Sequence, residues 1–358
     1  MIYLDYQATT PLAPEAREAM LPFLGDAFGN PHSPHRMGRE ARAVVELARE
    51  RIAALLPSGG RIAFTSGATE ALNWAIKGVA APGRVTIATE HAAVLDTVQA
   101  HCGDIAILAV DNAGLADPAA IAQPGAGLAA AMLVNNEIGV IQPVAALADR
   151  AHAVGALFLC DAVQGYGRVA IPEECDLIAI SAHKIHGPKG IGALWVRDGI
   201  DLAPLMHGGA QEALGRSGTL SPMLCAGFGV AAQLMADRAV EDHAHIERLW
   251  HAARAAFADW TLNGSAEHRY HGNLNLRRDG VDAARLISDV RTVAFSAGSA
   301  CASGSGRPSH VLKAIGLTDR EARSSIRRGF GRYTTPAEIE EAAALIEAAA
   351  ARQLRYAA

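Results

Sequence analysis

The chain has 358 residues, half of them hydrophobic and 19% charged, with 35 glycines and 16 prolines distributed along it. This composition is typical of a compact globular protein and excludes disordered and collagen-like classes. The 32 basic residues against 37 acidic ones give a net charge of −5, so nucleic acid is not an expected partner. At roughly 150 residues per domain, the length predicts two domains with room for a cleft between them.

The sequence also limits the compartment and the metal chemistry that we expect. It contains no run of 18 or more apolar residues, and its first residues lack the basic and apolar regions of a secretory signal. We therefore expect a cytoplasmic protein with no membrane partner. The five cysteines are odd in number, widely spaced and without a CxxC pair, which fits neither a disulfide framework nor a four-thiolate zinc site. We therefore expect no bound metal. The five cysteines are Cys102, Cys160, Cys175, Cys225 and Cys301.

From about residue 60, short apolar runs alternate with segments long enough for crossover helices. The runs do not alternate between polar and apolar residues, which predicts strands buried on both faces of a sheet. They cover 61–65, 84–88, 105–110, 129–134, 156–160 and 176–180, with a further strand expected over 191–196. The pattern predicts an α/β fold whose mostly parallel central sheet is flanked by helices.

The remaining third of the chain predicts a smaller α+β domain. A long helix is expected over 221–258, followed by a strand segment over 270–276 and a helix near 282–288. A short strand ending near Ser296 and a helix from 336 to about 355 complete this region. We place the large domain at 12–245 and the small domain at 1–11 together with 246–358.

Polar residues follow nearly every predicted strand, at the sheet edge where open α/β proteins bind ligands. Residues 66–69 (SGAT) lie between a strand and a helix, where free N–H groups and the helix dipole favour an anion. This segment resembles a phosphate cup, although a simple helix N-cap fits it equally well. The later strands are followed by His91, Asn136, Asp161, Gln164, Ser181, His183 and Lys184.

Lys184 is one of only four lysines, and it directly follows an apolar strand. Such a lysine can be desolvated, with a lowered pKa and an amine free to form a Schiff base, or it can simply reach water. Asp161 would suit the protonated ring nitrogen of pyridoxal phosphate, or it could cap a helix. His91 could cover the ring or shuttle protons, or be structural. A phosphate cup, His, Asp and Lys at successive strand ends together favour pyridoxal phosphate.

Nine segments carry a resemblance to a known family. They are 3–11 (YLDYQATTP), 28–33 (FGNPHS), 65–70 (TSGATE), 89–91 (TEH), 134–139 (VNNEIG), 181–190 (SAHKIHGPKG), 206–209 (MHGG), 216–219 (RSGT) and 299–301 (SAC). The chain resembles the cysteine desulfurases of iron–sulfur cluster assembly, which belong to the class V aminotransferase branch of pyridoxal-phosphate enzymes of fold type I. The resemblance runs from residue 3 to about 336.

The resemblance implies a role for each of the cofactor-binding residues. Lys184 would hold the cofactor covalently, Asp161 would pair with the pyridine nitrogen, Gln164 would bond the ring hydroxyl, and His91 would cover the ring face. Asn136 would lie beside the cofactor. The phosphate would be held by Ala68, Thr69, Ser181 and His183, and by Thr219 from the partner subunit of a homodimer.

The resemblance also implies the substrate and the nucleophile. Arg327, helped by Asn30, would bind the carboxylate of L-cysteine as a bidentate pair. The adjacent Arg328 leaves open which of the two arginines does so. Cys301 would attack the substrate sulfur, leaving L-alanine and a persulfide that passes to a protein acceptor such as an iron–sulfur scaffold. Because an ordinary thiol is only a few per cent ionised at pH 7, either His91 or the substrate has to take its proton.

The residues around Cys301 lead to one further expectation and to the alternatives. Residues 301–309 are rich in Gly and Ser, which predicts a mobile loop able to carry sulfur out to the acceptor. A β-lyase, a selenocysteine lyase or an aminotransferase on the same frame is the first alternative, with Cys301 as the discriminator. A non-catalytic dimeric scaffold is the second, and intact Lys184, Asp161 and His91 argue against it.

Overall fold

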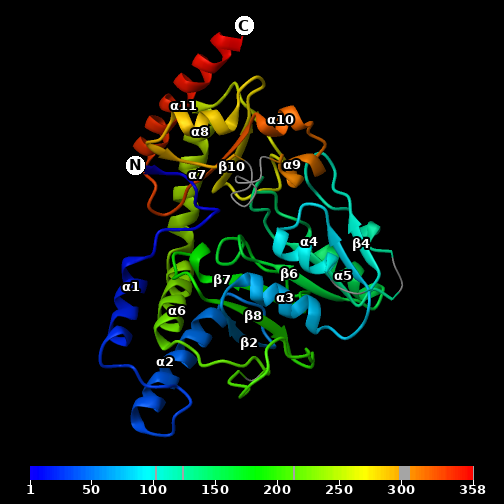
Figure 1. The fold of residues 1–358 in the computed structure, drawn as a ribbon, viewed down its shortest axis with the longest axis vertical. Helices are drawn as coiled ribbons and strands as arrows, with labels where there is room; N and C mark the ends of the chain where they lie inside the picture. Colours follow the sequence, from blue (N-terminus) through cyan, green and yellow to red (C-terminus); the bar gives the residue numbers. More distant parts are fainter. Residues whose placement is uncertain (101–102, 123–124, 213, 298–306, 358) are drawn as a thin grey trace.

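A computed structural model describes residues 1–100, 103–122, 125–212, 214–297 and 307–357 of the chain (Figure 1). Its elements form a larger group around a seven-stranded sheet and a smaller group around two short sheets. Figure 1 shows the smaller group, which holds both ends of the chain, above the larger one. Helix α7 (Ala239–Ala256) runs between the two groups.

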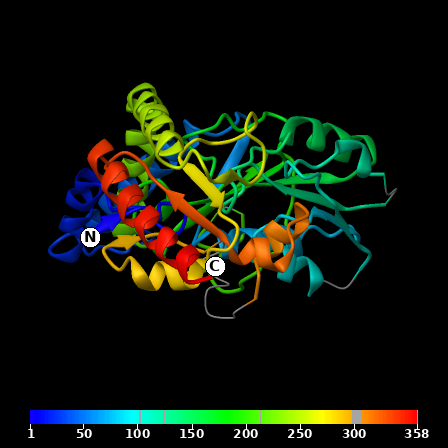
Figure 2. The same ribbon diagram turned by 90° about the horizontal axis from the view of Figure 1, so that it is seen from above.

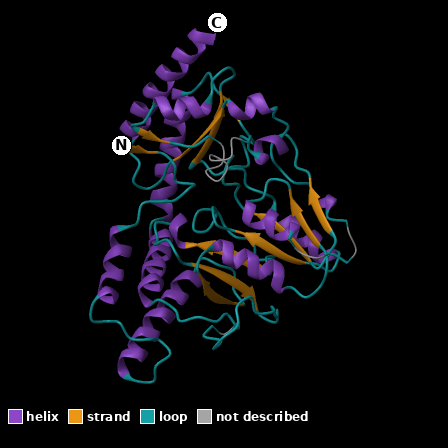
Figure 3. Cartoon of the chain, viewed as in Figure 1, coloured by secondary structure: helices purple, strands orange, loops and turns teal. Residues whose placement is uncertain are grey.

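The large sheet has the strand order β2-β8-β7-β6-β5-β3-β4. Strand β8 is antiparallel to both of its neighbours, and every other neighbouring pair is parallel (Figure 3). Six strands therefore share one direction, and their carboxyl ends meet at one edge. The strands are β2 (Gly60–Thr65), β3 (Arg84–Ile87), β4 (Ile105–Leu108), β5 (Leu128–Met132), β6 (Leu157–Asp161), β7 (Leu177–Ser181) and β8 (Gly192–Arg197).

The predicted strands and the α/β fold class are confirmed, but the expected burial is wrong for β4. Ile105 and Ile107 of this strand are 36% and 43% exposed. The reason is that β4 lies at the edge of the sheet, where it pairs with β3 alone.

Helices cover both faces of the large sheet, as the alternation of side chains along each strand requires. In β6, Phe158 and Cys160 join the core beneath α2 (Arg36–Ala53), α5 (Val144–Ala153) and α6 (Pro222–Asp237). Leu159 faces the opposite core, which α3 (Ala68–Gly78) and α4 (Ala92–Gln99) complete. Helix α1 (Pro14–Met20) and the short helix η1 (Leu21–Leu24) pack against α6.

The single helix expected over 221–258 is wrong. Arg238 leaves the helical conformation, with φ −110° and ψ 11°, and separates α6 from α7. The two helices are bent by 74° at this break. In the part of the chain that the structure describes, no single helix is long and apolar enough to cross a membrane; only this bent pair, taken together, has the necessary length and composition.

The smaller group has its own hydrophobic core. Strands β9 (Thr261–Leu262), β10 (Asn273–Arg277) and β12 (Ser325–Gly329) form an antiparallel sheet in the order β12-β10-β9. Strand β1 (Ile2–Tyr3) pairs in parallel with β11 (Val293–Ala294). Helices α7, α8 (Ala283–Asp289) and α11 (Pro336–Ala357) pack on these strands, so both ends of the chain share one core (Figure 2). The predicted α+β region is confirmed.

A fourth, small core joins the two groups. Ile138 and Val140, just after β5, pack against Val311, Leu312 and Ile315 of the smaller group. These last residues lie in and after α9 (His310–Ala314), which is followed by α10 (Asp319–Arg323). The turn after β5 is thereby held beside the carboxyl edge of the large sheet. Two further short helices are η2 (Pro118–Ala120) and η3 (Ala182–Lys184).

Candidate active site

A cavity of about 940 Å³ lies at the carboxyl edge of the large sheet, where the larger and smaller groups of elements face each other. Its walls come from the ends of β2, β3, β5, β6 and β7, from the segment after β1, and from the smaller group. The sequence-predicted residues that line it are Ala68, Thr69, His91, Asn136, Asp161, Gln164, Ser181, His183, Lys184 and Arg327.

Lys184 has the most strongly perturbed amine in this cavity. It ends the short helix η3, immediately after β7, and its Nζ donates to the backbone oxygens of Gln7 and Ala8. Burial, followed by the positive charge of Arg327, lowers the pKa of Lys184 to about 8. A substantial fraction of this amine is therefore neutral near physiological pH, as an attacking amine must be.

His91 and Asp161 are the titratable groups that interact with Lys184. Burial raises the pKa of the Asp161 carboxyl above its usual range, while the charges of His91 and Lys184 oppose this shift. Burial lowers the pKa of His91, against the charge of Asp161. His91 Nδ1 accepts a hydrogen bond from the backbone N–H of Ala93, 3.0 Å away, and caps α4. The neutral ring therefore carries its proton on Nε2.

The opposite end of the cavity is suited to an anion. Among the described residues, no side chain caps the first turn of α3, so the N–H groups at Ala68 and Thr69 remain available beside the positive end of the helix dipole. A Cβ on Gly192 would lie 2.8 Å from the backbone of Gly67, so the glycine lets β8 approach this turn closely. Ser181 is buried, and burial lowers the pKa of His183 to about 4, which keeps that imidazole neutral.

The two adjacent arginines of β12 face opposite sides of their sheet, as the period of a strand requires. Arg327 lines the cavity, whereas Arg328 lies over the ring of Phe257, 3.4 Å from its centroid. Burial lowers the pKa of Arg328 to about 9. Arg327 donates to Asp5 Oδ1 at 2.8 Å and to the backbone oxygen of Asn136 at 3.0 Å. Of the two, only Arg327 is placed to meet a ligand in the cavity.

Of the expected site residues that the structure describes, Asn30 and Thr219 do not line the cavity. Asn30 is exposed, and its Oδ1 accepts from the backbone N–H of His32. Thr219 is also exposed; an ion pair of 2.9 Å between Arg216 and Glu70 holds the preceding residues against α3. Cys301 lies outside the described residues, as do residues 301–306 of the loop expected over 301–309.

The structure adds cavity residues that the sequence argument did not assign. Gln7 and Glu137 lie within two of the motif segments, but no chemistry was attached to them. The backbone oxygen of Gln7 accepts from Gln164 Nε2 at 2.9 Å. The buried side-chain Oε1 of Gln7 has no hydrogen-bond partner among the described residues. His310 lies in neither a strand end nor a motif, so the sequence offered no signal for it. Asp5 belongs to a motif segment, but its contact with Arg327 joins residues 322 positions apart.

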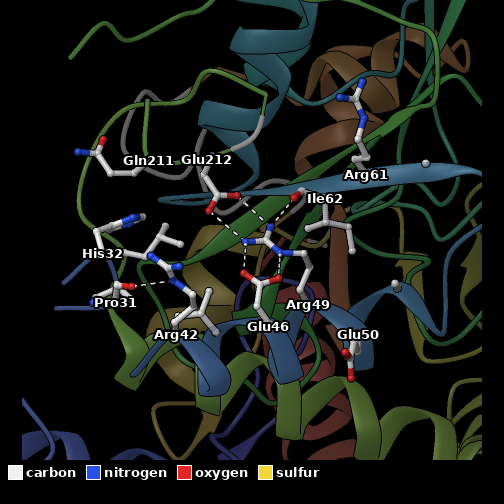
Figure 4. Close-up of a pocket in the computed structure, with 14 residues that line it drawn as sticks. Pro31, His32, Arg42, Glu46, Arg49, Glu50, Arg61, Ile62, Gln211 and Glu212 are labelled. Carbon is white, nitrogen blue, oxygen red and sulfur yellow. Dashed lines mark hydrogen bonds and ion pairs between the residues drawn. The ribbon is translucent and has the colours of Figure 1, made fainter. Parts of the chain in front are cut away.

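A second cavity, of about 570 Å³, lies beside α2 and β2 (Figure 4). Figure 4 shows the guanidinium of Arg49 between the carboxylates of Glu46 and Glu212. Glu212 also accepts from the backbone N–H of Phe64 at 3.0 Å, and Arg49 donates to the backbone oxygen of Ile62. These two side chains bond the free edge of β2 as a neighbouring strand would, so the arrangement has a structural purpose.

The chemistry of the first cavity fits pyridoxal phosphate. A partly neutral lysine amine suits the aldehyde, and a buried carboxyl suits the ring nitrogen because a cationic neighbour would stabilise its ionised form. The uncapped helix start suits the phosphate. No group of three or more His, Cys, Asp or Glu side chains in the described ranges could hold a metal ion.

Comparisons with known proteins agree with this chemistry. Residues 2–342 match the family described as Aminotransferase class-V. Cysteine desulfurase IscS of Rickettsia bellii is 42% identical over 368 aligned positions, covering 96% of this chain and 90% of the relative. The mitochondrial cysteine desulfurase of Eremothecium gossypii is 43% identical, covering 95% and 74%. A solved structure described as a NifS-like protein superposes with a TM-score of 0.89 at 30% identity, covering 97% and 98%. The chain therefore belongs to the class V aminotransferase family and, within it, to the pyridoxal-phosphate-dependent cysteine desulfurases.

Proposed function

We propose that the first cavity is the active site, in which Lys184 holds pyridoxal phosphate and L-cysteine gives up its sulfur to Cys301. The observation that carries this proposal is the lowered pKa of Lys184 in a cavity shared with His91, Asp161 and Arg327. Burial of four ionisable groups around one space is costly unless they act on a ligand, and perturbed groups of this kind are concentrated at catalytic sites.

The residues divide the work by position. Bound pyridoxal phosphate withdraws electrons from the substrate, which makes its α-proton and then its carbon–sulfur bond labile. Asp161, whose Oδ1 accepts from the backbone N–H of Val163, would keep the ring nitrogen protonated. Lys184 would take the substrate α-proton, because its pKa is low enough for a neutral amine to be present. Arg327 would orient the substrate carboxylate. That carboxylate would compete with Asp5 for the Arg327 guanidinium.

His91 is better placed to give a proton than to take one. Its Nδ1 is occupied as the acceptor of the α4 cap, and the neutral ring has its proton on Nε2. To accept a proton at Nε2, the neutral ring would first need its own proton on Nδ1 instead. A protonated Nδ1 could no longer accept from the Ala93 N–H, so the α4 cap would be lost. We infer that His91 covers the ring and returns a proton to the product, and that the substrate rather than His91 takes the thiol proton of Cys301.

The sulfur step balances without any added oxidant. The thiolate of Cys301 attacks the substrate sulfur, so a sulfur–sulfur bond forms as the carbon–sulfur bond breaks. The electron pair of the broken bond remains with the carbon fragment, which gains protons and leaves as L-alanine. Cys301 is left as a persulfide, and because a second turnover needs a free thiol, the sulfur has to pass to an acceptor. We propose a protein acceptor such as an iron–sulfur scaffold.

The experiment that tests this function is replacement of Cys301. Cys301→Ala should retain the visible absorbance of bound cofactor, because Cys301 has no proposed part in holding it, and should release no sulfide from L-cysteine in the presence of a reductant. Cys102→Ala is the control and should match the wild type. Sulfide production that is unchanged in Cys301→Ala would instead identify a β-lyase, which eliminates sulfur without a protein thiol.

We also propose a cytoplasmic homodimer with a large domain at 12–245 and a small domain at 1–11 and 246–358. Separate hydrophobic cores support that division. Leu24 and Phe28 are 70% and 75% exposed on one short segment, which supports contact with a second copy. Free, buried thiols at Cys160, Cys175 and Cys225 are typical of a reducing compartment.

A further inference from the structure

Ser309 joins the smaller group of elements to the wall of the active-site cavity. Its hydroxyl donates to Glu137 Oε2 at 2.5 Å and accepts from the backbone N–H of Leu312 at 3.2 Å, which makes it the N-cap of α9. Both residues are buried, with Ser309 7% and Glu137 1% exposed. The expectation of a free loop through residue 309 is therefore wrong at its last position, because this hydroxyl satisfies a buried carboxyl group.

Glu137 is itself fixed by the elements around it. Its backbone N–H donates to Asn135 Oδ1 at 2.8 Å, and its backbone oxygen accepts from Asn275 Nδ2 of β10 at 3.0 Å. Burial raises the pKa of the Glu137 carboxyl, while the hydrogen bond from Ser309 opposes this shift. Because the backbone N–H and the backbone oxygen of Glu137 are both hydrogen-bonded, its carboxyl group is a fixed acceptor for the Ser309 hydroxyl.

A second contact lies one residue further along the chain. His310 Nε2 is 2.8 Å from the backbone oxygen of Glu90, the residue before His91. Both His91 and His310 line the cavity. The start of α9 is thus attached to the end of β3 through His310 and to the turn after β5 through Ser309. These are two of the strand ends that form the cofactor wall.

The chain before Cys301 is attached as well, but to the smaller group. The backbone N–H of Ser296 donates to the oxygen of Arg327 at 3.1 Å, and the Arg327 N–H donates to the Ser296 oxygen at 2.7 Å. Cys301 is five residues after Ser296 and eight residues before Ser309.

We propose that Ser309 and His310, through Glu137 and the Glu90 backbone, are positioning residues that set where Cys301 meets the substrate sulfur. This inference rests on the proposed function. Ser309 and His310 hold the chain on the C-terminal side of Cys301 to the cofactor wall, and they make no bond to the cofactor-binding residues Lys184 and Asp161. Their loss removes two polar attachments of the chain that follows Cys301, while the hydrogen bonds of Lys184 and Asp161 stay in place.

The test uses the full-length enzyme loaded with pyridoxal phosphate. In Ser309→Ala and His310→Leu, persulfide formed on Cys301 in a single turnover, measured by mass spectrometry, should slow by roughly 10- to 100-fold, the usual effect of misplacing a reacting group. The absorbance of the bound cofactor should match that of the wild type. The cysteine concentration at which the absorbance change caused by added L-cysteine reaches saturation should match it as well. Ser309→Thr and His310→Gln, which restore a donor at each position, should recover most of the rate.

Thr318→Ala supplies the matched control. Thr318 caps α10 as Ser309 caps α9, but its hydroxyl bonds Glu321 of the same helix. This variant loses a comparable cap and should form persulfide at the wild-type rate. Equal slowing in Thr318→Ala and Ser309→Ala, or no slowing in Ser309→Ala and His310→Leu, would overturn the proposal.

Hydrogen exchange in the cofactor-free protein provides a readout that is independent of turnover. Amides of 310–315 should exchange faster in Ser309→Ala and remain protected in Ser309→Thr. Unchanged protection would overturn the anchor itself. A wild-type enzyme that forms no persulfide would overturn the proposed function, and the exchange data would still decide whether Ser309 holds α9.

Discussion

At the scale of single residues, the active site is defined by charges that shift one another. Lys184 receives opposing influences: burial and Arg327 lower its pKa, whereas Asp5 and Asp161 raise it. With a pKa of about 8, roughly a tenth of the amine is neutral at pH 7, compared with about 0.03% for an ordinary lysine. This difference of more than a hundredfold is what makes Lys184 suitable for capturing an aldehyde.

The pH dependence of cofactor capture follows from this shift. In the cofactor-free protein, the rate of reaction with pyridoxal phosphate should rise about tenfold per pH unit and level off near pH 8, because a lowered lysine pKa places the neutral amine at lower pH. Arg327→Gln removes a lowering charge and frees Asp5, so the midpoint should move upward. Stopped-flow absorbance measures both profiles. A midpoint near 10 in the wild type would contradict the environment described for Lys184.

At the scale of elements, the large sheet protects its two edges differently. Strand β4 leaves alternate side chains exposed. Strand β2 instead has Arg49 bonded to the oxygen of Ile62 and Glu212 bonded to the N–H of Phe64. Backbone groups at a sheet edge would otherwise remain open to another chain. The pair also ties α2 to the segment after β8, and therefore to the residues leading to Thr219.

Breaking that pair should destabilise the fold while leaving the active-site cavity intact. Glu212→Gln keeps an acceptor for the Phe64 N–H but leaves the partly buried Arg49 short of a counter-charge, with a loss of about 2 kcal/mol of unfolding free energy. Urea denaturation at fixed protein concentration measures the loss. Glu50→Gln, an exposed change beside the same cavity, should stay within about 0.5 kcal/mol of the wild type. Equal denaturation midpoints for the two variants would show that the Arg49–Glu212 ion pair contributes nothing to stability.

The sequence predicted those features of the fold that depend on local patterns. Apolar runs located the strands, and the residues directly after them located nine residues of the cavity, whereas Arg327 was expected only from the family resemblance. The edge position of β4 was not predictable from its apolar residues, because strand order depends on pairings distant in sequence. The break at Arg238 lacks the Gly or Pro that usually ends a helix. The contacts of Arg327 with Asp5 and of Ser309 with Glu137 join separate parts of the chain, so no spacing rule reveals them.

At the scale of the whole molecule, the position of Thr219 bears on the proposed homodimer. Thr219 is exposed and outside the cavity of its own chain, although Arg216, three residues earlier, is fixed to Glu70 in the first turn of α3. Although burial works to raise it, hydrogen bonds from Arg216 and Ser66 hold the pKa of Glu70 below its ordinary value. The segment 216–219 is therefore attached beside the turn that we propose for the phosphate, and its last residue is exposed, as contact with a second copy requires.

Subunit exchange tests whether Thr219 completes the site of a partner. Thr219→Ala should lose one charge-assisted hydrogen bond to the cofactor phosphate, about 1.5 to 3 kcal/mol, and retain cofactor roughly 10- to 150-fold more weakly. Lys184→Ala should be inactive by itself. If sites are composite, a mixed dimer of the two variants carries both lesions in one site and neither in the other, so at limiting cofactor the mixture should regain about a quarter of wild-type activity after random exchange. If Thr219 serves its own chain, every site in the mixed dimer keeps one lesion and activity stays at the level of the unmixed variants. Sedimentation of the wild type decides the remaining point, because a fully active monomer would rule out any contribution from a partner.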